Sequence, residues 1–321
     1  MSDEAARTET GEVVSVNVSA EKGTIKRPAP YIRLYEHGVA DDAHAGAWHR
    51  QVSLLSEEVI REFEREAGRR IAPGEFAENI TTRGLSLRNM CPLDRIAANQ
   101  AELEVTQIGK ECHGETCAIF REVGRCVMPK EGIFCRVVTG GRIAPGDRIA
   151  FRPRPLRVTI LTVSDRASRG DYADRSGPRL RERLEGFFSG KRWHPQIETR
   201  VLPDEARRLE TELRAACDGG ADVVFTTGGT GVGPRDVTPD VVAALADRTI
   251  PGIMEHIRVK YGQSNPKALL SRGVAAVLGR TLVYTLPGSV RAVGEYVEEI
   301  LATLEHTVLM LHGVDAHGSS G

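Results

Sequence analysis

The fold of the second half of the chain is decided by residues 222–239, which read DVVFTTGGTGVGPRDVTP. Residues 222–226, with the apolar run Val223-Val224-Phe225, predict a buried strand, and the glycine-rich residues 227–233 follow it directly. Thr238-Pro239 then predicts the start of a helix, because proline is favoured in the first helical turn. Glycines let backbone N–H groups approach an anion closely, and threonines add hydroxyl donors, so the loop predicts a phosphate site. No lysine follows the last glycine, which excludes a Walker A loop, and a plain strand-to-helix turn remains the alternative.

The sequence on either side repeats this order of strand and helix. The other expected strands are Arg157–Val163, Ile197–Leu202, Val274–Leu278 and Thr281–Leu286. The other expected helices are Pro178–Phe187 with Ser176 as its cap, a helix from the cap Asp204 to Asp218, and Val290–Leu311. Strands separated by helices predict a three-layer α/β domain with a mostly parallel sheet.

Polar or glycine-containing segments directly follow these strands. Besides the glycine loop they are Ser164-Asp165-Arg166, Pro203-Asp204-Glu205 and Pro287-Gly288-Ser289. Because ligands bind at the carboxyl ends of the strands in such a sheet, we expect these segments to converge on one rim. Asp204 and Asp236 are candidate ligands of Mg²⁺, which prefers carboxylates, and Arg235 adds a positive charge beside the expected phosphates. For Asp204 an ordinary helix N-cap is the alternative.

The first half of the chain has a different pattern. Short alternating runs at Gly11–Val18, Gln51–Leu55, Ala101–Ile108 and Ile133–Thr139 are separated by turns, and they predict an antiparallel, barrel-like β domain. One helix interrupts it, with Ser56 as the N-cap and Gly68 as the stop. Two prolines in Phe151–Leu156 predict a linker. We therefore expect a β-barrel domain at 1–151, an α/β domain at 156–312 and a flexible tail at 313–321.

Composition and charge narrow the class of protein. Hydrophobic residues make up 40% and charged residues 27% of the 321 residues, which excludes wholesale disorder and a coiled coil. A formal net charge of -1 provides no general attraction for nucleic acid or an anionic membrane, so we expect neither as a partner. The start of the chain does not resemble a signal peptide, and no apolar run is long enough to span a membrane. These features predict a cytoplasmic protein whose six cysteines stay reduced.

The ordered motifs of the second half resemble the MogA/MoaB family over about residues 156–312. They are residues 161–166 (LTVSDR), 174–178 (DRSGP), 203–205 (PDE), 226–231 (TTGGTG), 234–239 (PRDVTP), 250–252 (IPG), 270–272 (LSR) and 286–289 (LPGS). The resemblance implies a molybdopterin adenylyltransferase that binds ATP, Mg²⁺ and molybdopterin at the strand ends. The terminal phosphate of molybdopterin would attack the α-phosphorus of ATP, and pyrophosphate would leave.

The same resemblance implies roles for individual residues. Asp204 and Asp236 match the essential carboxylates of the family and Ser289 a pterin-side contact, while Val290 departs from a second proline found in many relatives. The residues expected to bind nucleotide or pterin are Ser164, Asp165, Arg166, Thr227, Gly228, Gly229, Thr230, Gly231, Arg235, Ser271, Arg272, Pro287, Gly288 and Ser289. Members of the family are commonly trimers, so we expect a homo-oligomer, with a metal-insertion protein as a further candidate partner.

Four segments of the first half, at residues 38–46, 49–55, 73–80 and 132–137, resemble the MOSC domain. Residues 97–100 (AANQ) depart from the glycine-containing turn of that family. The resemblance implies a β-barrel that binds the pterin cofactor and, in some members, carries sulfur on a cysteine, which makes a cysteine desulfurase a candidate partner. The expected pocket residues are His44, His49, Arg50, Asn79 and Cys135.

Cys112 is the first candidate for a reactive thiol, because it follows an expected strand end and Lys110 and His113 can lower its pKa. Cys135 is the second candidate. The alternative is that both are small buried residues. A zinc site formed by Cys112, His113, Cys117 and Cys126 has weak spacing.

Three functions follow from these observations. The first is adenylylation of molybdopterin by the second half, with cofactor binding or sulfur handling by the first. The second is a carrier that holds the pterin cofactor without turnover. The third is a sulfur transferase that uses Cys112, in which the second half only binds cofactor. Fusion of two domains linked to one scarce cofactor favours the first function. The sequence does not distinguish molybdenum from tungsten.

Overall fold

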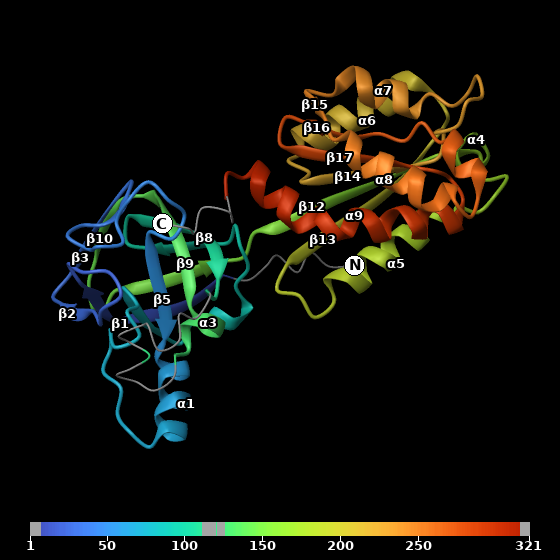
Figure 1. Cartoon of the computed structure of the whole chain (residues 1–321). Coiled ribbons are helices and arrows are strands. Elements are labelled where there is room, and N and C mark those ends of the chain that lie inside the picture. The colour runs from blue at the N-terminus through green and yellow to red at the C-terminus, as the bar shows by residue number, and fades with distance from the viewer. Residues whose placement is uncertain (1–7, 111–119, 121–125, 315–321) are drawn as a thin grey trace. The chain divides into compact units, whose positions relative to one another are not determined.

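The computed structural model of the chain describes residues 8–110, 120 and 126–314 (Figure 1). These residues divide into two compact units. The first holds the described residues up to Arg154 together with Arg192–His194 and Val314, and the second holds Pro155–Lys191 and Pro195–Gly313.

The first unit is built on a closed seven-stranded barrel, which confirms the expected β-rich fold. Its strands follow one another as β1, β11, β7, β8, β9, β5 and β6, and β1 pairs with both β11 and β6. Their bounds are β1 Glu9–Val18, β5 Val52–Ser56, β6 Ile80–Arg83, β7 Arg95–Ala98, β8 Ala101–Ile108, β9 Ile133–Thr139 and β11 Arg148–Arg152. The short strand β2 (Arg27–Ala29) pairs with β1, and β3 (Ile32–Tyr35), β4 (Gly38–Val39) and β10 (Gly141–Ile143) form a second sheet.

Among the barrel strands that the structure describes, one neighbouring pair, β5 and β6, runs in parallel, and the helix α1 (Glu57–Ala67) explains why. It crosses from β5 to β6, which therefore run in parallel. Ser56 Oγ accepts a hydrogen bond from Val59 N at 3.3 Å, and Gly68 has a φ of 67°, so the predicted cap and stop are both confirmed. The buried face of α1 packs on Phe76, with the rings of Phe63 and Phe76 edge to face at 5.1 Å. The short helices η1 (Leu87–Asn89) and α3 (Met128–Glu131) complete the unit.

The junction is shorter than the predicted linker. Phe151 and Arg152 belong to β11, and β12 (Pro155–Val163) begins at Pro155, so only Pro153 and Arg154 lie between the strands. A proline is tolerated as the first residue of a strand, which explains why Pro155 does not delay β12. At the other end of the chain Val314 is buried, and residues 315–321 of the expected tail lie outside the described residues.

The second unit is a three-layer α/β structure around a six-stranded sheet with the order β13, β12, β14, β17, β16, β15. The further strands are β13 His194–Leu202, β14 Val223–Thr227, β15 Arg248–Thr249, β16 Ala275–Leu278 and β17 Thr281–Leu286. The helices are α4 Asp165–Ser168, α5 Ser176–Phe188, α6 Ala206–Asp218, α7 Thr238–Leu245, α8 Pro251–Gly262, η3 Pro266–Leu270 and α9 Val290–Leu311. Figure 1 shows α6 and α7 on the side of the sheet opposite α5 and α9.

The sheet is mixed, and its description as mostly parallel is not confirmed. β14 pairs in parallel with β12 and β17, as expected. β16 and β17 are joined by two residues, Gly279 and Arg280, so they form an antiparallel hairpin, and β15 pairs antiparallel with β16. Two-residue connections permit only antiparallel neighbours. None of the helices in the described ranges has the length and apolarity needed to cross a membrane.

Candidate functional site

The ends of β12, β14 and β17 meet at Gly228, as the sequence predicts. Gly228 N donates a hydrogen bond to Leu286 O at 2.9 Å. A Cβ atom on Gly228 would lie 2.2 Å from Val163 O, and its φ of 103° also disfavours a side chain. Gly288 packs on the same residue, because its own missing Cβ would lie 3.4 Å from Gly228 Cα. Glycine is therefore required here so that three strand ends can touch.

A cavity of about 480 Å³ opens at these strand ends. This volume lies within the usual range for sites that bind small molecules. Of the residues predicted to bind ligand, the cavity is lined by Ser164, Arg166, Thr227, Gly288 and Ser289. It is also lined by Thr162, Val163, Ala167, Tyr172, Asp174, Arg175, Ser176 and Val290, to which sequence reasoning gave no ligand-binding role.

Asp174 organises one wall of this cavity. Its carboxylate accepts hydrogen bonds from Thr162 Oγ1 at 2.7 Å, from Ser176 N at 3.0 Å and from Gly177 N at 3.1 Å. Helix α5 therefore begins at Ser176 under the carboxylate of Asp174, and the prediction that Ser176 caps this helix is wrong.

Two arginines and the start of α9 give the cavity a preference for anions, whereas the start of α5 is already occupied by the carboxylate of Asp174. Ser289 Oγ caps α9 by accepting a hydrogen bond from Ala292 N at 3.2 Å. The N-terminal end of a helix carries a partial positive charge. Arg166 and Arg175 add full charges, and the Arg166 guanidinium lies 5.4 Å from the ring centroid of Tyr172.

The glycine loop folds around a carboxylate and several hydroxyl groups. Asp236 Oδ2 accepts a hydrogen bond from Gly233 N at 2.8 Å, and a Cβ on Gly231 would lie 2.7 Å from the same oxygen. A Cβ on Gly229 would lie 2.6 Å from Thr238 Oγ1. Four buried threonine hydroxyls in the described ranges have no hydrogen-bond partner, and three of them, those of Thr226, Thr227 and Thr238, lie at this loop. Such groups are rare and indicate donors available to a ligand or to water.

Asp165 and Asp204 hold two of the strand ends together. Asp204 Oδ2 accepts from Asp165 N at 2.8 Å, and Asp165 Oδ1 accepts from Asp204 N at 3.0 Å. Arg235, from the far end of the glycine loop, forms an ion pair with Asp165. The N-cap position of α6 is Glu205, so the interpretation of Asp204 as an ordinary helix cap is wrong.

Arg272 holds the glycine loop in place through hydrogen bonds to backbone carbonyls of the loop. Its backbone N donates to Thr230 O at 2.9 Å, its Nε donates to Gly231 O at 2.8 Å, and a further guanidinium nitrogen donates to Asp236 O. Its Nη1 pairs with Asp240 at 2.7 Å, and this guanidinium lowers the pKa of Asp240. Ser271 precedes it in the chain, and Pro287 is half-buried between β17 and the cavity residue Gly288.

The residues predicted for the pocket of the first unit separate into two groups. Asn79 is buried and donates to Asp42 Oδ2 at 3.0 Å, and Cys135 is buried in the barrel core. Burial raises the pKa of the Cys135 thiol well above its ordinary value, so its proposed role as a second reactive cysteine is not supported. His44, His49 and Arg50 are partly exposed in the loop before β5. Cys112, His113 and Cys117 lie outside the described residues.

Comparisons with known proteins agree with this division of the chain. The family model described as "Probable molybdopterin binding domain" matches residues 159–306, and the MOSC domain model matches residues 41–150. The chain is 40% identical to a molybdopterin adenylyltransferase of Haemophilus influenzae over 146 residues, which is 45% of this chain and 73% of that protein. It is 37% identical to a molybdopterin adenylyltransferase of Escherichia coli over 162 residues, which is 50% of this chain and 80% of that protein.

One solved structure that the chain matches is the molybdopterin biosynthesis enzyme MoaB of Thermus thermophilus. It is 39% identical, and the match covers 49% of this chain and 97% of that chain with a TM-score of 0.45.

Proposed function

The chain belongs to the molybdopterin adenylyltransferase (MogA/MoaB) family, and from that premise we propose that its second unit transfers the adenylyl group of ATP to molybdopterin. A terminal phosphate oxygen of molybdopterin would form a bond to the α-phosphorus of ATP. The bond from that phosphorus to the bridging oxygen would break, and pyrophosphate would leave with its electron pair. The observation that carries the proposal is the convergence of the anion-preferring cavity, the glycine loop and the aspartates on the same strand ends.

We assign the nucleotide phosphates to the glycine loop. Its backbone amides and the unpartnered hydroxyls of Thr227 and Thr238 are donors for phosphate oxygens. Catalysis of such a reaction comes mainly from positioning the reactants and from neutralising the charge on the phosphates. Donors that are already fixed in place supply both without a further reorganisation cost. Arg272 would act by holding the loop, because its guanidinium is already engaged with two loop carbonyls.

The carboxylates fit a role in binding Mg²⁺. Asp204 and Asp236 present hard oxygen donors to the glycine loop, since Asp204 Oδ1 and Asp236 Oδ2 lie next to the positions of Gly229 and Gly231. Mg²⁺ is usually held by one or two carboxylates, with waters and substrate phosphates as its other ligands. Bound there, the ion would neutralise charge on the polyphosphate.

The cavity beside the loop suits the phosphate end of the pterin. Arg166 and Arg175 offer charge, and Thr227 and Ser289 offer hydroxyls at its wall. Val290 also lines the cavity, so the departure from proline at this position lies on the surface assigned to the pterin.

For the first unit we propose that the MOSC domain binds the same cofactor before or after molybdenum or tungsten is inserted, with Cys112 as a candidate sulfur carrier. The family resemblance also predicts a homotrimer and, as a partner, a metal-insertion protein or a cysteine desulfurase. Composition predicts a cytoplasmic location.

The proposal is tested by pyrophosphate release from ATP in the presence of molybdopterin. Asp204→Asn and Asp236→Asn keep the shape of each side chain and remove its charge, so we expect each to lower the rate by about a hundredfold or more. Glu210→Gln removes an exposed carboxylate of the same unit and should leave the rate unchanged. A full rate in both aspartate variants, or tight molybdopterin binding without any use of ATP, would overturn the proposal and favour a carrier.

A further inference from the structure

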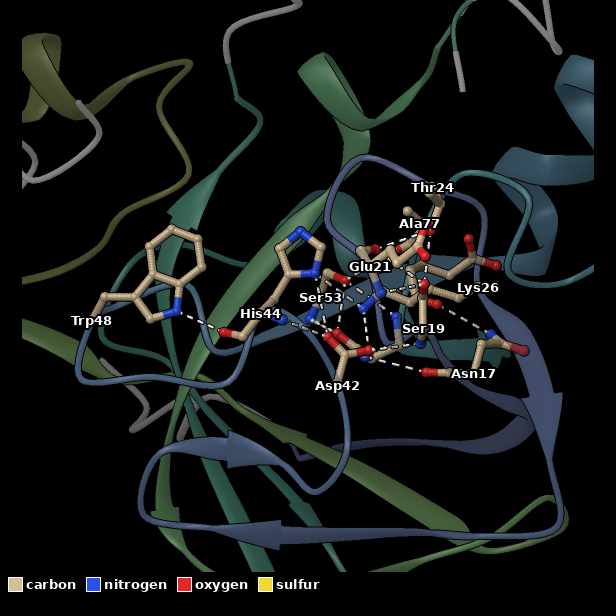
Figure 2. Close-up of polar contacts among 12 residues, drawn as sticks. Asn17, Ser19, Glu21, Thr24, Lys26, Asp42, His44, Trp48, Ser53 and Ala77 are labelled. Atoms are coloured by element: carbon tan, nitrogen blue, oxygen red, sulfur yellow. Dashed lines mark hydrogen bonds and ion pairs between the residues drawn. The ribbon is translucent and has the colours of Figure 1, made fainter. Parts of the chain in front are cut away.

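Two buried carboxylates of the first unit are held by different partners. Asp42 pairs with the buried ammonium of Lys26 (Figure 2). Asp94, which is fully buried, accepts hydrogen bonds from Cys91 N and from Arg154 N, each at 2.7 Å. Removing a charge from water is costly, so buried carboxylates are paired with other groups or bind metal ions. Sequence reasoning gave no role to Asp94.

A tight turn between η1 and β7 brings the thiol of Cys91 close to Asp94. Asp94 N donates to Cys91 O at 3.2 Å, and the two residues between them are Pro92 and Leu93. Proline is favoured at the second position of such a turn, and Leu93 has a φ of 77° at the third, where glycine is usual. Cys91 is 1% exposed, and its Sγ lies within 4.8 Å of an oxygen of Asp94. The turn therefore presents a thiol and a carboxylate at one buried point.

His194 reaches the same point from a distant part of the sequence. Its Nε2 lies 3.2 Å from Asp94 Oδ2, and its ring centroid lies 6.3 Å from that of Phe151 in β11. Arg192–His194 belong to the first unit, so the three side chains lie in one compact unit. The thiol, the carboxylate and the imidazole offer ligand atoms that all lie within 4.8 Å of one another.

These separations fit a tetrahedral zinc ion. Bonds of about 2.0–2.2 Å to nitrogen or oxygen and about 2.3 Å to sulfur place two ligand atoms about 3.3–3.6 Å apart. The 3.2 Å between His194 Nε2 and Asp94 Oδ2 is already close to this value. The other separations exceed it by at most about 1.5 Å, which small rotations of the Cys91 and His194 side chains can close. Thiolate and imidazole ligands favour Zn²⁺ over Mg²⁺ or Ca²⁺, which prefer oxygen.

We propose that Cys91, Asp94 and His194 form a Zn²⁺ site in the first unit, with water as the fourth ligand. Cys91 Sγ and His194 Nε2 bind the ion without their protons, which pass to the solvent. The charges of the thiolate and the carboxylate together balance that of the ion, and the 25% exposure of the His194 side chain gives the ion and the water access. The site shares no residue with the pocket expected of the MOSC domain and does not depend on the function proposed for the second unit.

Titration of the metal-free, full-length protein with Co²⁺ tests this site, because a thiolate bound to Co²⁺ absorbs in the near ultraviolet. The parent protein carries serine in place of Cys112, Cys117 and Cys126, so the alternative zinc site cannot contribute. We expect a saturable absorption that added Zn²⁺ removes by competition. Cys91→Ser should abolish this absorption, and His194→Gln should weaken binding by about tenfold or more, because each removes a ligand.

His256→Gln and Cys217→Ser are the matched controls. His256 also lies beside a carboxylate, with its Nε2 2.9 Å from Glu299 Oε2, and Cys217 is a half-buried thiol of the second unit. Neither belongs to the proposed site, so both variants should bind Co²⁺ as the parent does.

Thermal unfolding provides a second readout and verifies the fold of each variant. Zn²⁺ bound to the folded state should raise the unfolding midpoint of the parent and leave that of Cys91→Ser unchanged. His194 is partly exposed, so its variant serves even if Cys91→Ser lowers stability. No thiolate absorption in the parent, or equal Co²⁺ affinity in the parent, Cys91→Ser and His194→Gln, would overturn the proposal.

Discussion

Glu78 is the buried acid of the first unit whose protonation should be visible in the stability of the fold. Its Oε1 accepts hydrogen bonds from Gly74 N at 2.6 Å and Thr81 Oγ1 at 2.9 Å, whereas its Oε2 is buried without a partner among the described residues. Burial raises the pKa of this carboxyl above its ordinary value of 4.5. The folded state therefore binds a proton more tightly than the unfolded state.

The sign of the pH dependence follows. A raised pKa stabilises the fold at pH values below 4.5, and this contribution is lost as the pH rises toward the folded value. We expect Glu78→Gln to remove a decline in the free energy of unfolding above pH 4.5, amounting to at most about 1.4 kcal/mol per pH unit. Urea unfolding followed by tryptophan fluorescence measures it, because Trp48 and Trp193 both belong to the first unit.

Glu58→Gln is the control for this prediction. Glu58 also accepts a backbone hydrogen bond, from Gly84 N at 2.7 Å, but it is exposed. Its variant should keep the pH slope of the parent. The assignment to Glu78 is wrong if Glu78→Gln shows the same slope as well.

The roles of single residues were the hardest features to predict from the sequence. An aspartate shortly before a helix resembles a cap in the sequence, yet the Asp174 carboxylate accepts from the first amides of α5 while Asp204 accepts from the backbone N of Asp165. The difference depends on which strand end lies nearby, which local sequence does not encode. Cys135 was a candidate thiol on sequence grounds, but alternation along β9 places it inside the barrel. Asp42 and Lys26 meet only through the fold, so no local pattern reveals them.

At the level of elements, the clearest prediction concerns the glycine loop. Gly228→Ala would force a Cβ to within 2.2 Å of Val163 O at a φ of 103°. Because the obstacle is backbone and the conformation disfavours side chains, we expect the second unit to lose about 3 kcal/mol of stability. Urea unfolding followed by far-ultraviolet circular dichroism measures the loss.

Gly186→Ala is the control within the same unit, and we expect it to change the stability in the opposite direction. Gly186 lies inside α5, and a Cβ there would meet no heavy atom within 4 Å. Alanine has the higher helix propensity, so this variant should gain about 0.5–1 kcal/mol. Equal stability of Gly228→Ala and the parent would contradict the close approach of the strand ends.

Long elements with clear periodicity were predicted well. The strand 133–139, the helix 290–311 and the cap and stop of α1 agree with the structure. Strands of two to four residues, such as β4 and β15, are too short to show alternation, and their existence depends on partners distant in sequence. The two strands of the β16–β17 hairpin were predicted correctly, but the short connection should have indicated an antiparallel pair.

At the level of the whole molecule, the sequence predicted the class of each half because each has its own hydrophobic pattern. The barrel closes around a core that includes Val13, Leu54 and Leu103, and the second unit has a separate core that includes Leu161, Leu209 and Val283. The near-zero net charge fits small anionic ligands bound by local donors.

The most direct measurement is pyrophosphate release from ATP by the full-length protein, with and without molybdopterin. The proposed function predicts release that requires molybdopterin, is lost in Asp236→Asn and persists in Glu210→Gln. Release at the same rate without molybdopterin, or unaltered release in Asp236→Asn, would contradict the assignment of adenylyl transfer to the second unit.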